Sequence, residues 1–250
     1  MIDSSRIFFL LLCPPFFFLQ AIVFECKSSD SCGCSRNNVD IDLRILSGEM
    51  VVPHSWSWAV SMRNSYGEHI CGGTILSQSF ILTAAHCFHR ISKEYRPYSI
   101  IVGVDSLLST TGQVRTVSDI IIHPKWNSTT KENDIALLRL DTPMSLDDPN
   151  LSKICLPDVR TLQQQIRYPI LDSSLIAIGW GITTWEDLIS PMYLRQVALQ
   201  VIDPTESKCK TIIKNVQVQF CAAVKGGEKG NQLDRRSSNH RIFYSRYMPR

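Results

Sequence analysis

The chain has 250 residues, which is enough for one large all-β domain or for two halves of ordinary size. With 44% hydrophobic residues, 12 Gly and 12 Pro, the composition is that of a globular protein with many turns, and it excludes a disordered or fibrous chain. The net charge is +3, but residues 225–250 hold seven basic and two acidic residues, so the remainder is slightly acidic. This basic end has no Lys/Arg stripe at helical spacing and no aromatic platform, so we expect no nucleic-acid partner.

The N-terminus predicts export. Arg6 precedes an apolar run of 18 residues, Ile7–Phe24, which Pro14 and Pro15 interrupt. This pattern is typical of a secretory signal peptide, here residues 1–24 with an undefined cleavage site. An uncleaved signal anchor is the alternative, because 18 residues lie at the lower limit of a membrane span. We expect a secreted, extracellular protein that has no membrane contact after signal cleavage.

The cysteines and two sequons fit an oxidising, secretory compartment. Of nine cysteines, Cys13 leaves with the signal peptide, and the remaining eight suit disulfides. Zinc binding is the competing interpretation, but Cys32 and Cys34 are too close for a Cys-x-x-Cys arm and the other cysteines stand singly. We therefore expect disulfides, no metal and no cofactor. Asn127-Ser128-Thr129 and Asn150-Leu151-Ser152 are candidate glycosylation sites in exposed loops.

Residues 25–44 form a polar, cysteine-bearing segment with little periodicity, which we interpret as a propeptide or linker. It ends at Arg44-Ile45-Leu46-Ser47-Gly48, where a basic residue precedes an apolar residue and a small, flexible pair. A protease specific for Arg would cut there and free the α-amino group of Ile45. An Arg-Ile bond is common, so Arg44 and Ile45 become candidate activation residues only in the context of the whole pattern.

From Ile45 onward, short apolar runs of strand length alternate with turn residues. This spacing predicts an antiparallel sandwich or barrel without a long amphipathic helix in the middle. The expected strands are Trp58–Met62, Thr74–Leu76, Ile100–Val104, Val117–Ile122, Ile135–Leu140, Leu175–Ile178 and Gln196–Ile202.

Two residues suggest acid–base chemistry. His86 lies among small residues, one position before Cys87, and Asp134 leads directly into an apolar strand. A buried carboxylate at the start of a strand can accept the Nδ1–H of an imidazole, hold its tautomer and stabilise the imidazolium. The competing interpretations are a structural histidine and a turn aspartate.

Eight motifs occur in the order found in the trypsin-like, chymotrypsin-fold serine endopeptidases, and the chain resembles that family. Each motif is weak alone, and together they cover most of the mature chain. They are Arg44–Gly48, Trp56–Ser61, Cys71–Leu76, Leu82–Cys87, Asp134–Leu140, Ile154–Pro157, Gly179–Gly181 and Phe220–Ala223.

The resemblance implies an all-β, chymotrypsin-like double β-barrel over residues 45–232. The first barrel would span roughly residues 45–155, and a partial second barrel roughly residues 156–225. It also implies that His86 is the general base and Asp134 its orienting acid. The implied disulfides are Cys71–Cys87, Cys209–Cys221, and Cys155 with Cys32 or Cys34, which leaves Cys26 to the other of these two.

The chain departs from the family at the nucleophile. The triad needs a serine that loses its proton to His86, with backbone N–H groups around that serine forming an oxyanion hole. The family places it in Gly-Asp-Ser-Gly-Gly, and the separation of roughly 90 residues from Asp134 points to residues 225–240. No such motif stands there, and Ser237 and Ser238 follow two arginines without the required glycines. The partner of the freed Ile45 ammonium, the specificity pocket and the strand that pairs with substrate are missing with it.

We therefore expect a chain truncated before the nucleophile motif, with an unpaired strand edge in its incomplete second barrel and a non-homologous basic tail, residues 233–250. The first interpretation is a secreted trypsin-like endopeptidase, inactive in this form. The family implies protein or peptide substrates and an activating protease at Arg44. The alternatives are a pseudoprotease that acts as a binding or decoy protein, and a truncated transcript or gene model whose product does not fold.

Overall fold

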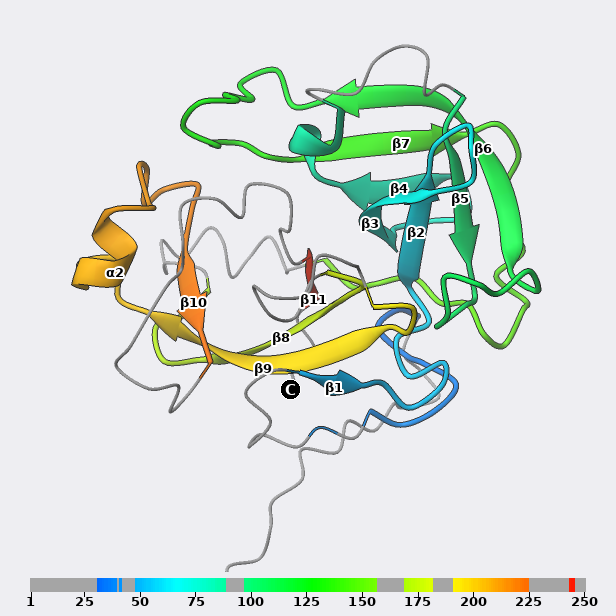
Figure 1. Ribbon diagram of the computed structural model, residues 1–250, viewed down its shortest axis with the longest axis horizontal. Helices are drawn as coiled ribbons and strands as arrows, with labels where there is room; N and C mark the ends of the chain where they lie inside the picture. The colour runs from blue at the N-terminus through cyan, green and yellow to red at the C-terminus, as the bar shows by residue number, and fades with distance from the viewer. Residues whose placement is uncertain are drawn as a thin grey trace, which may run out of the picture.

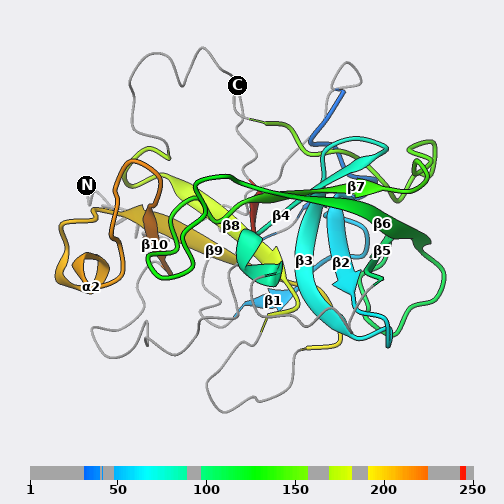
Figure 2. The same cartoon turned by 90° about the horizontal axis from the view of Figure 1, so that it is seen from above.

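The computed structural model describes residues 31–39, 41, 48–88, 97–156, 169–181, 191–224 and 243–245. This part of the chain is almost entirely β, in two halves that lie side by side (Figures 1 and 2). Its helical turns are η1 (Ala85–Phe88) and α2 (Ser207–Lys210). Within the described ranges, no helix has the length and apolar character needed to cross a membrane. The predicted signal peptide, residues 1–24, lies outside these ranges.

The first half is a closed antiparallel barrel in the strand order β2-β3-β4-β7-β6-β5. It closes because β2 pairs with both β3 and β5, and two register shifts, in the β2–β3 and β6–β7 pairs, help the sheet to curve. The strands are β2 (Ala59–Arg63), β3 (His69–Ile75), β4 (Phe80–Thr83), β5 (Ser99–Val102), β6 (Gln113–Ile122) and β7 (Ala136–Leu140).

The second half is an open sheet in the order β1-β9-β8-β11, with β10 also paired to β9. Its strands are β1 (Glu49–Met50), β8 (Ser174–Gly179), β9 (Arg195–Ile202), β10 (Cys221–Ala223) and β11 (Phe243–Ser245). The prediction of an all-β, chymotrypsin-like fold with a closed first barrel and an incomplete second one is confirmed.

The core follows from the alternation of side chains along the strands. In β7, Ala136, Leu138 and Leu140 are buried while Arg139 points to solvent, as the two-residue period of a strand requires. The main hydrophobic cluster fills the barrel and continues to Ile176 and Ile178 of β8. The halves are also joined by a buried hydrogen bond of 2.7 Å, in which Trp56 Nε1 donates to Gln196 Oε1.

The segment interpreted as a propeptide or linker contributes to this core. Val39 and Ile41 are buried in the main cluster, although both precede residue 45, where the peptidase domain was expected to begin. Gly33 N donates to Lys153 O at 2.8 Å, and Asn37 Nδ2 donates to Pro53 O at 2.6 Å. The N-terminal segment, defined here as residues 31–39 and 41, is therefore packed as part of the fold.

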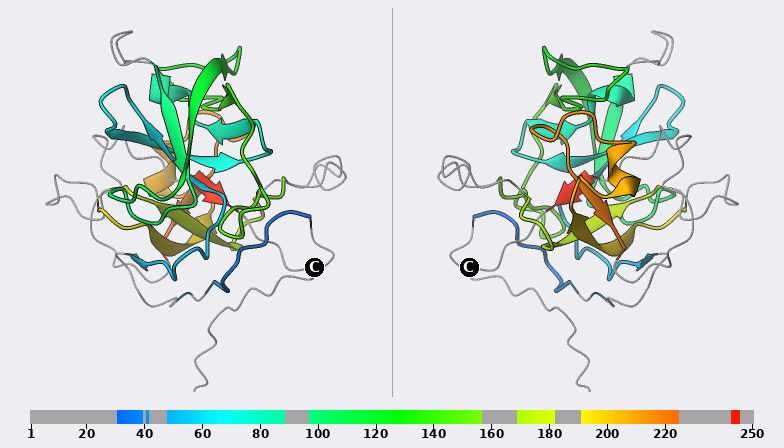
Figure 3. Two further views of the ribbon diagram at one scale, coloured as in Figure 1. Left: turned by 90° about the vertical axis from the view of Figure 1, so that its right-hand side faces the viewer. Right: turned by 90° about the vertical axis from the view of Figure 1, so that its left-hand side faces the viewer.

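The basic tail also differs from expectation. We predicted a non-homologous basic tail and an unpaired strand edge, but β11, red in Figure 3, pairs antiparallel with β8. In the register of this pair, Tyr244 lies opposite Ala177. The neighbouring residues of β8, Leu175 to Ile178, are buried and apolar. The prediction of an unpaired edge was wrong at β8, because Phe243–Ser245 pair with Ile176–Ile178 and supply hydrogen-bond partners along that part of the edge.

Deleting residues 241–250 is expected to make the protein self-associate, because the deletion uncovers the apolar β8 strand and its backbone hydrogen-bonding groups. Sedimentation velocity at several concentrations checks this. A matched control, deletion of residues 246–250, keeps β11 and is expected to remain at the mass of the full chain. Equal behaviour of the two deletions would contradict a capping role for β11.

Candidate active site

The site is built where β4 ends. Small, buried side chains at Ala84 and Ala85 let the backbone turn directly from β4 into η1, and Thr83 Oγ1 donates to Gly72 O at 2.9 Å. The Cys71–Cys87 disulfide fixes η1 to β3 with a Cα–Cα distance of 6.2 Å. His86 therefore sits on a single short turn that is held covalently from one side.

His86 and Asp134 are brought together from positions 48 residues apart. His86 Nδ1 lies 2.9 Å from Asp134 Oδ2, and the backbone N–H of His86 donates to Asp134 Oδ1 at 2.8 Å. Their side chains are only 10% and 9% exposed, so little water competes for these contacts. A carboxylate held by two hydrogen bonds to one residue fixes both the position of the ring and its tautomer. A neutral ring that donates from Nδ1 presents Nε2 as a proton acceptor.

Asp134 is delivered by an ordered loop, residues 123–134, between β6 and β7. Lys131 and Asn133 adopt left-handed backbone conformations with φ of 63° and 54°. Asn133 Nδ2 donates to Lys125 O at 2.9 Å, which ties the two arms of the loop together just before the carboxylate. The loop also meets the second half, where Gln219 Nε2 donates to Thr130 O at 3.0 Å.

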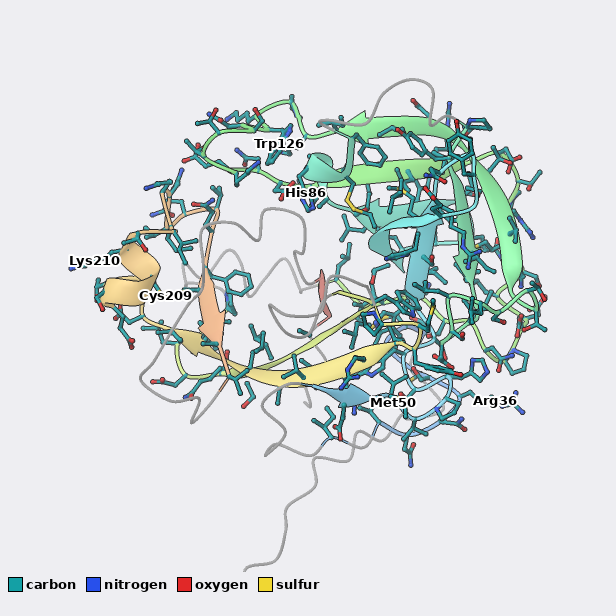
Figure 4. All side chains as sticks on the ribbon, viewed as in Figure 1. Arg36, Met50, His86, Trp126, Cys209 and Lys210 are labelled. Carbon is teal, nitrogen blue, oxygen red and sulfur yellow. A yellow bond between two sulfur atoms is a disulfide. The ribbon has the colours of Figure 1, made fainter. Side chains whose placement is uncertain are left out.

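The Nε2 atom of His86 has no hydroxyl partner among the described residues. The sulfur of Cys87 lies 4.0 Å away, but it is in a disulfide and offers no thiolate. A serine–histidine contact occurs elsewhere, with Ser61 Oγ 2.9 Å from His69 Nδ1. Ser61 is 0% exposed, so no substrate carbonyl can reach its oxygen. The arrangement therefore pairs an imidazole with a carboxylate at the position where Figure 4 labels His86.

One group of side chains has the compactness of a metal site. One possible ligand atom each from Cys71, His86 and Cys87 lies within 4.8 Å of the others. The two sulfurs are bonded to each other, however, and a metal needs thiolates. The cluster is therefore a histidine beside a disulfide, and its residues do not fit a metal.

Two further disulfides lie away from the histidine. Cys32–Cys155 anchors the N-terminal segment, and Cys209–Cys221 joins α2 to β10. Between the alternatives left open for Cys155, the structure selects Cys32. Cys34 is disulfide-bonded as well, and its expected partner, Cys26, lies outside the described residues.

The comparisons with known proteins agree with this geometry. A family model described as Trypsin matches residues 45–234, which is more than half of the chain. This chain belongs to the trypsin family. Among solved structures it is similar to neuropsin, a serine protease expressed in the limbic system of mouse brain. The two share 26% sequence identity over 76% of this chain and 79% of that one, with a TM-score of 0.59.

Within this member of the trypsin family, several predicted positions lie outside the described residues. They are Arg44 and Ile45 at the expected activation bond, and Ser237 and Ser238 in the tail. Both sequons are described, with Asn127 in the loop that ends at Asp134 and Asn150 beside the N-terminal segment. No sequence pattern predicted the contact of Gln219 with Thr130, because it joins two polar residues in separate loops.

Proposed function

We propose that this chain is a secreted, trypsin-like serine endopeptidase family member that lacks its nucleophile and does not hydrolyse peptide bonds. His86 acts as the preserved general base and Asp134 as its orienting acid. The family's protein or peptide substrates, and an activating protease at Arg44, belong to the same proposal. The observation that carries it is His86 Nε2, which faces no hydroxyl in the described part of the chain, in a sequence without Gly-Asp-Ser-Gly-Gly.

The chemical reason is that a base alone does not cleave an amide. In this reaction class the serine oxygen attacks the carbonyl carbon, and its proton moves to the histidine and then to the leaving amine. Backbone N–H groups around the serine stabilise the oxyanion, and removing even one such donor costs about 10²–10³ in kcat. Without the serine, no group attacks the carbonyl carbon, and without its loop, no backbone N–H groups stabilise the oxyanion. Binding of a peptide requires neither the serine nor the loop.

We expect no labelling of the purified, secreted chain by a fluorophosphonate and no turnover of Arg-, Lys- or Phe-terminated ester substrates. An active trypsin-like protease in the same assay is the positive control. The His86→Ala variant is the matched negative control, because labelling of a real triad needs the base. Stoichiometric labelling that disappears in His86→Ala would overturn the inactive assignment.

The alternative functions are a pseudoprotease that works as a binding or decoy protein, and a product of a truncated transcript or gene model. The closed barrel and the intact His86–Asp134 pair favour the former, since both belong to a half that is complete without the missing motif. Translating the genomic sequence downstream of the Gln232 codon in all three frames separates the two. A cysteine followed by Gly-Asp-Ser-Gly-Gly there supports truncation, and its absence together with a monomeric, cooperatively unfolding chain supports the pseudoprotease.

A further inference from the structure

The 123–134 loop is folded on itself around one asparagine. Asn127 N donates to Glu132 O at 3.1 Å, and Lys131 N donates to Asn127 O at 2.8 Å. Trp126 N donates to His123 O at 2.9 Å at the base of the loop, and Lys131 Nζ lies 5.6 Å from the centroid of the Trp126 ring. The backbone of Asn127 is therefore held in place at an exposed tip of the molecule.

The side chain of Asn127 is oriented by the same loop. Its Oδ1 accepts hydrogen bonds from Thr129 N at 2.9 Å and from Thr130 N at 3.1 Å. A carboxamide is planar and rigid, so holding Oδ1 in the loop also fixes the direction of Nδ2. Asn127 is exposed, and its Nδ2 has no hydrogen-bond partner in the described ranges. Nδ2 is the atom that N-glycosylation modifies.

The second sequon has a different environment. Asn150 is half-buried, and its Oδ1 accepts from Arg36 Nη1 of the N-terminal segment at 3.0 Å. The next residue, Leu151, is buried in the main core, and Ser152 Oγ is buried without a partner in the described part of the chain. An oligosaccharide at Asn150 would compete for space with the N-terminal segment, whereas one at Asn127 would extend into solvent.

We propose that Asn127 is the N-glycan acceptor of this chain, in preference to Asn150. In the transfer, Asn127 Nδ2 forms a bond to the anomeric carbon of an oligosaccharide carried on a lipid diphosphate. The bond from that carbon to the diphosphate breaks, the lipid diphosphate leaves with the electron pair, and one amide proton goes to a base of the transferase. The inference rests on the export component of the proposed function, since this chemistry belongs to the secretory pathway.

The consequence concerns access to the site. The glycan would stand on the loop that ends at Asp134 and touches the second half through Thr130 and Gln219. Figure 4 labels Trp126 of this loop and His86. An oligosaccharide at Asn127 would screen this edge against large partners and would shield the peptide bonds after Lys125 and Lys131, while small peptides keep their approach from other sides.

The test is glycosylation-site mapping of the full chain from secreting eukaryotic cells. Enzymatic removal of N-glycans in H₂¹⁸O converts each occupied Asn to ¹⁸O-labelled Asp, which peptide mass spectrometry locates. We expect Thr129→Ala to lose the Asn127 glycoform, and the matched Ser128→Ala variant, which keeps the sequon, to retain it. Deglycosylation should also accelerate tryptic cleavage after Lys125 and Lys131 in the parent chain but not in Thr129→Ala.

If the exported protein carries no glycan at Asn127, or no more glycan there than at Asn150, the glycosylation proposal is overturned. The proposed function is left intact by that result. Unchanged cleavage at the two lysines would overturn the screening consequence. A second arm places residues 25–250 behind a signal peptide of proven function. If the chain behind the proven signal peptide is glycosylated but the chain with its own N-terminus is not exported, only the proposal of export is contradicted.

Discussion

Replacing both Cys32 and Cys155 with serine is expected to lower the free energy of unfolding by about 5 kcal/mol in the chain-entropy model. This disulfide joins residues 123 positions apart, while Cys209–Cys221 spans 12 and Cys71–Cys87 spans 16. Closing the longer loop removes more conformations from the unfolded chain. Substituting both cysteines avoids an odd thiol that could exchange with the neighbouring Cys34 bridge.

The measurement is guanidinium unfolding of the secreted double variant beside the parent chain. The matched control is Cys209→Ser with Cys221→Ser, for which the same model gives a loss of about 3 kcal/mol. A smaller loss for the Cys32–Cys155 pair than for the control would contradict the entropic account. It would indicate that the buried Val39 and Ile41 already hold the N-terminal segment without the bridge.

Ile41→Ala is expected to destabilise the protein by about 2–5 kcal/mol, because the change removes buried methyl groups and leaves a cavity. Ile41 is 1% exposed and belongs to the main hydrophobic cluster, yet it precedes the residues that the family model matches. If the segment were an exposed propeptide, the same substitution would change the free energy of unfolding by no more than about 0.5 kcal/mol. The experiment therefore tests whether the N-terminal segment is part of the cooperative fold.

Leu108→Ala is the matched control for Ile41→Ala, since Leu108 is 71% exposed and its truncation removes a similar apolar group. The free energies of unfolding of the two variants, from thermal and denaturant unfolding, should differ by about 1.5 kcal/mol or more. Equal stabilities would show that the burial of Ile41 does not contribute to the folded state.

The features that the sequence could predict are those with local signatures. Short apolar runs such as that of β7 predict strands, and small residues around a histidine one position before a cysteine mark the candidate general base. The pairing of His86 with Asp134 depends on contacts across 48 residues, and the chemistry of the two motifs together with the family resemblance suggested it.

The features that the sequence could not predict depend on distant partners. Ile41 stands between Asp40 and Asp42, so its burial is decided by the apolar surface it meets and not by its neighbours. β4 has only four residues and merges into the histidine motif, and β1 has two. β11 lies in a basic, unpatterned stretch and forms a strand because β8 offers an open edge.

Barrel closure also determines where the molecule can open. Every strand of the barrel has a hydrogen-bonded neighbour on both sides, whereas in the described part of the chain the second sheet ends in strands with one neighbour each. Local unfolding starts where fewest hydrogen bonds and apolar contacts must break. Opening fluctuations will therefore be concentrated in the second sheet. The imidazole and its carboxylate belong to the closed half, so they keep their geometry while strands of the second sheet open and reclose.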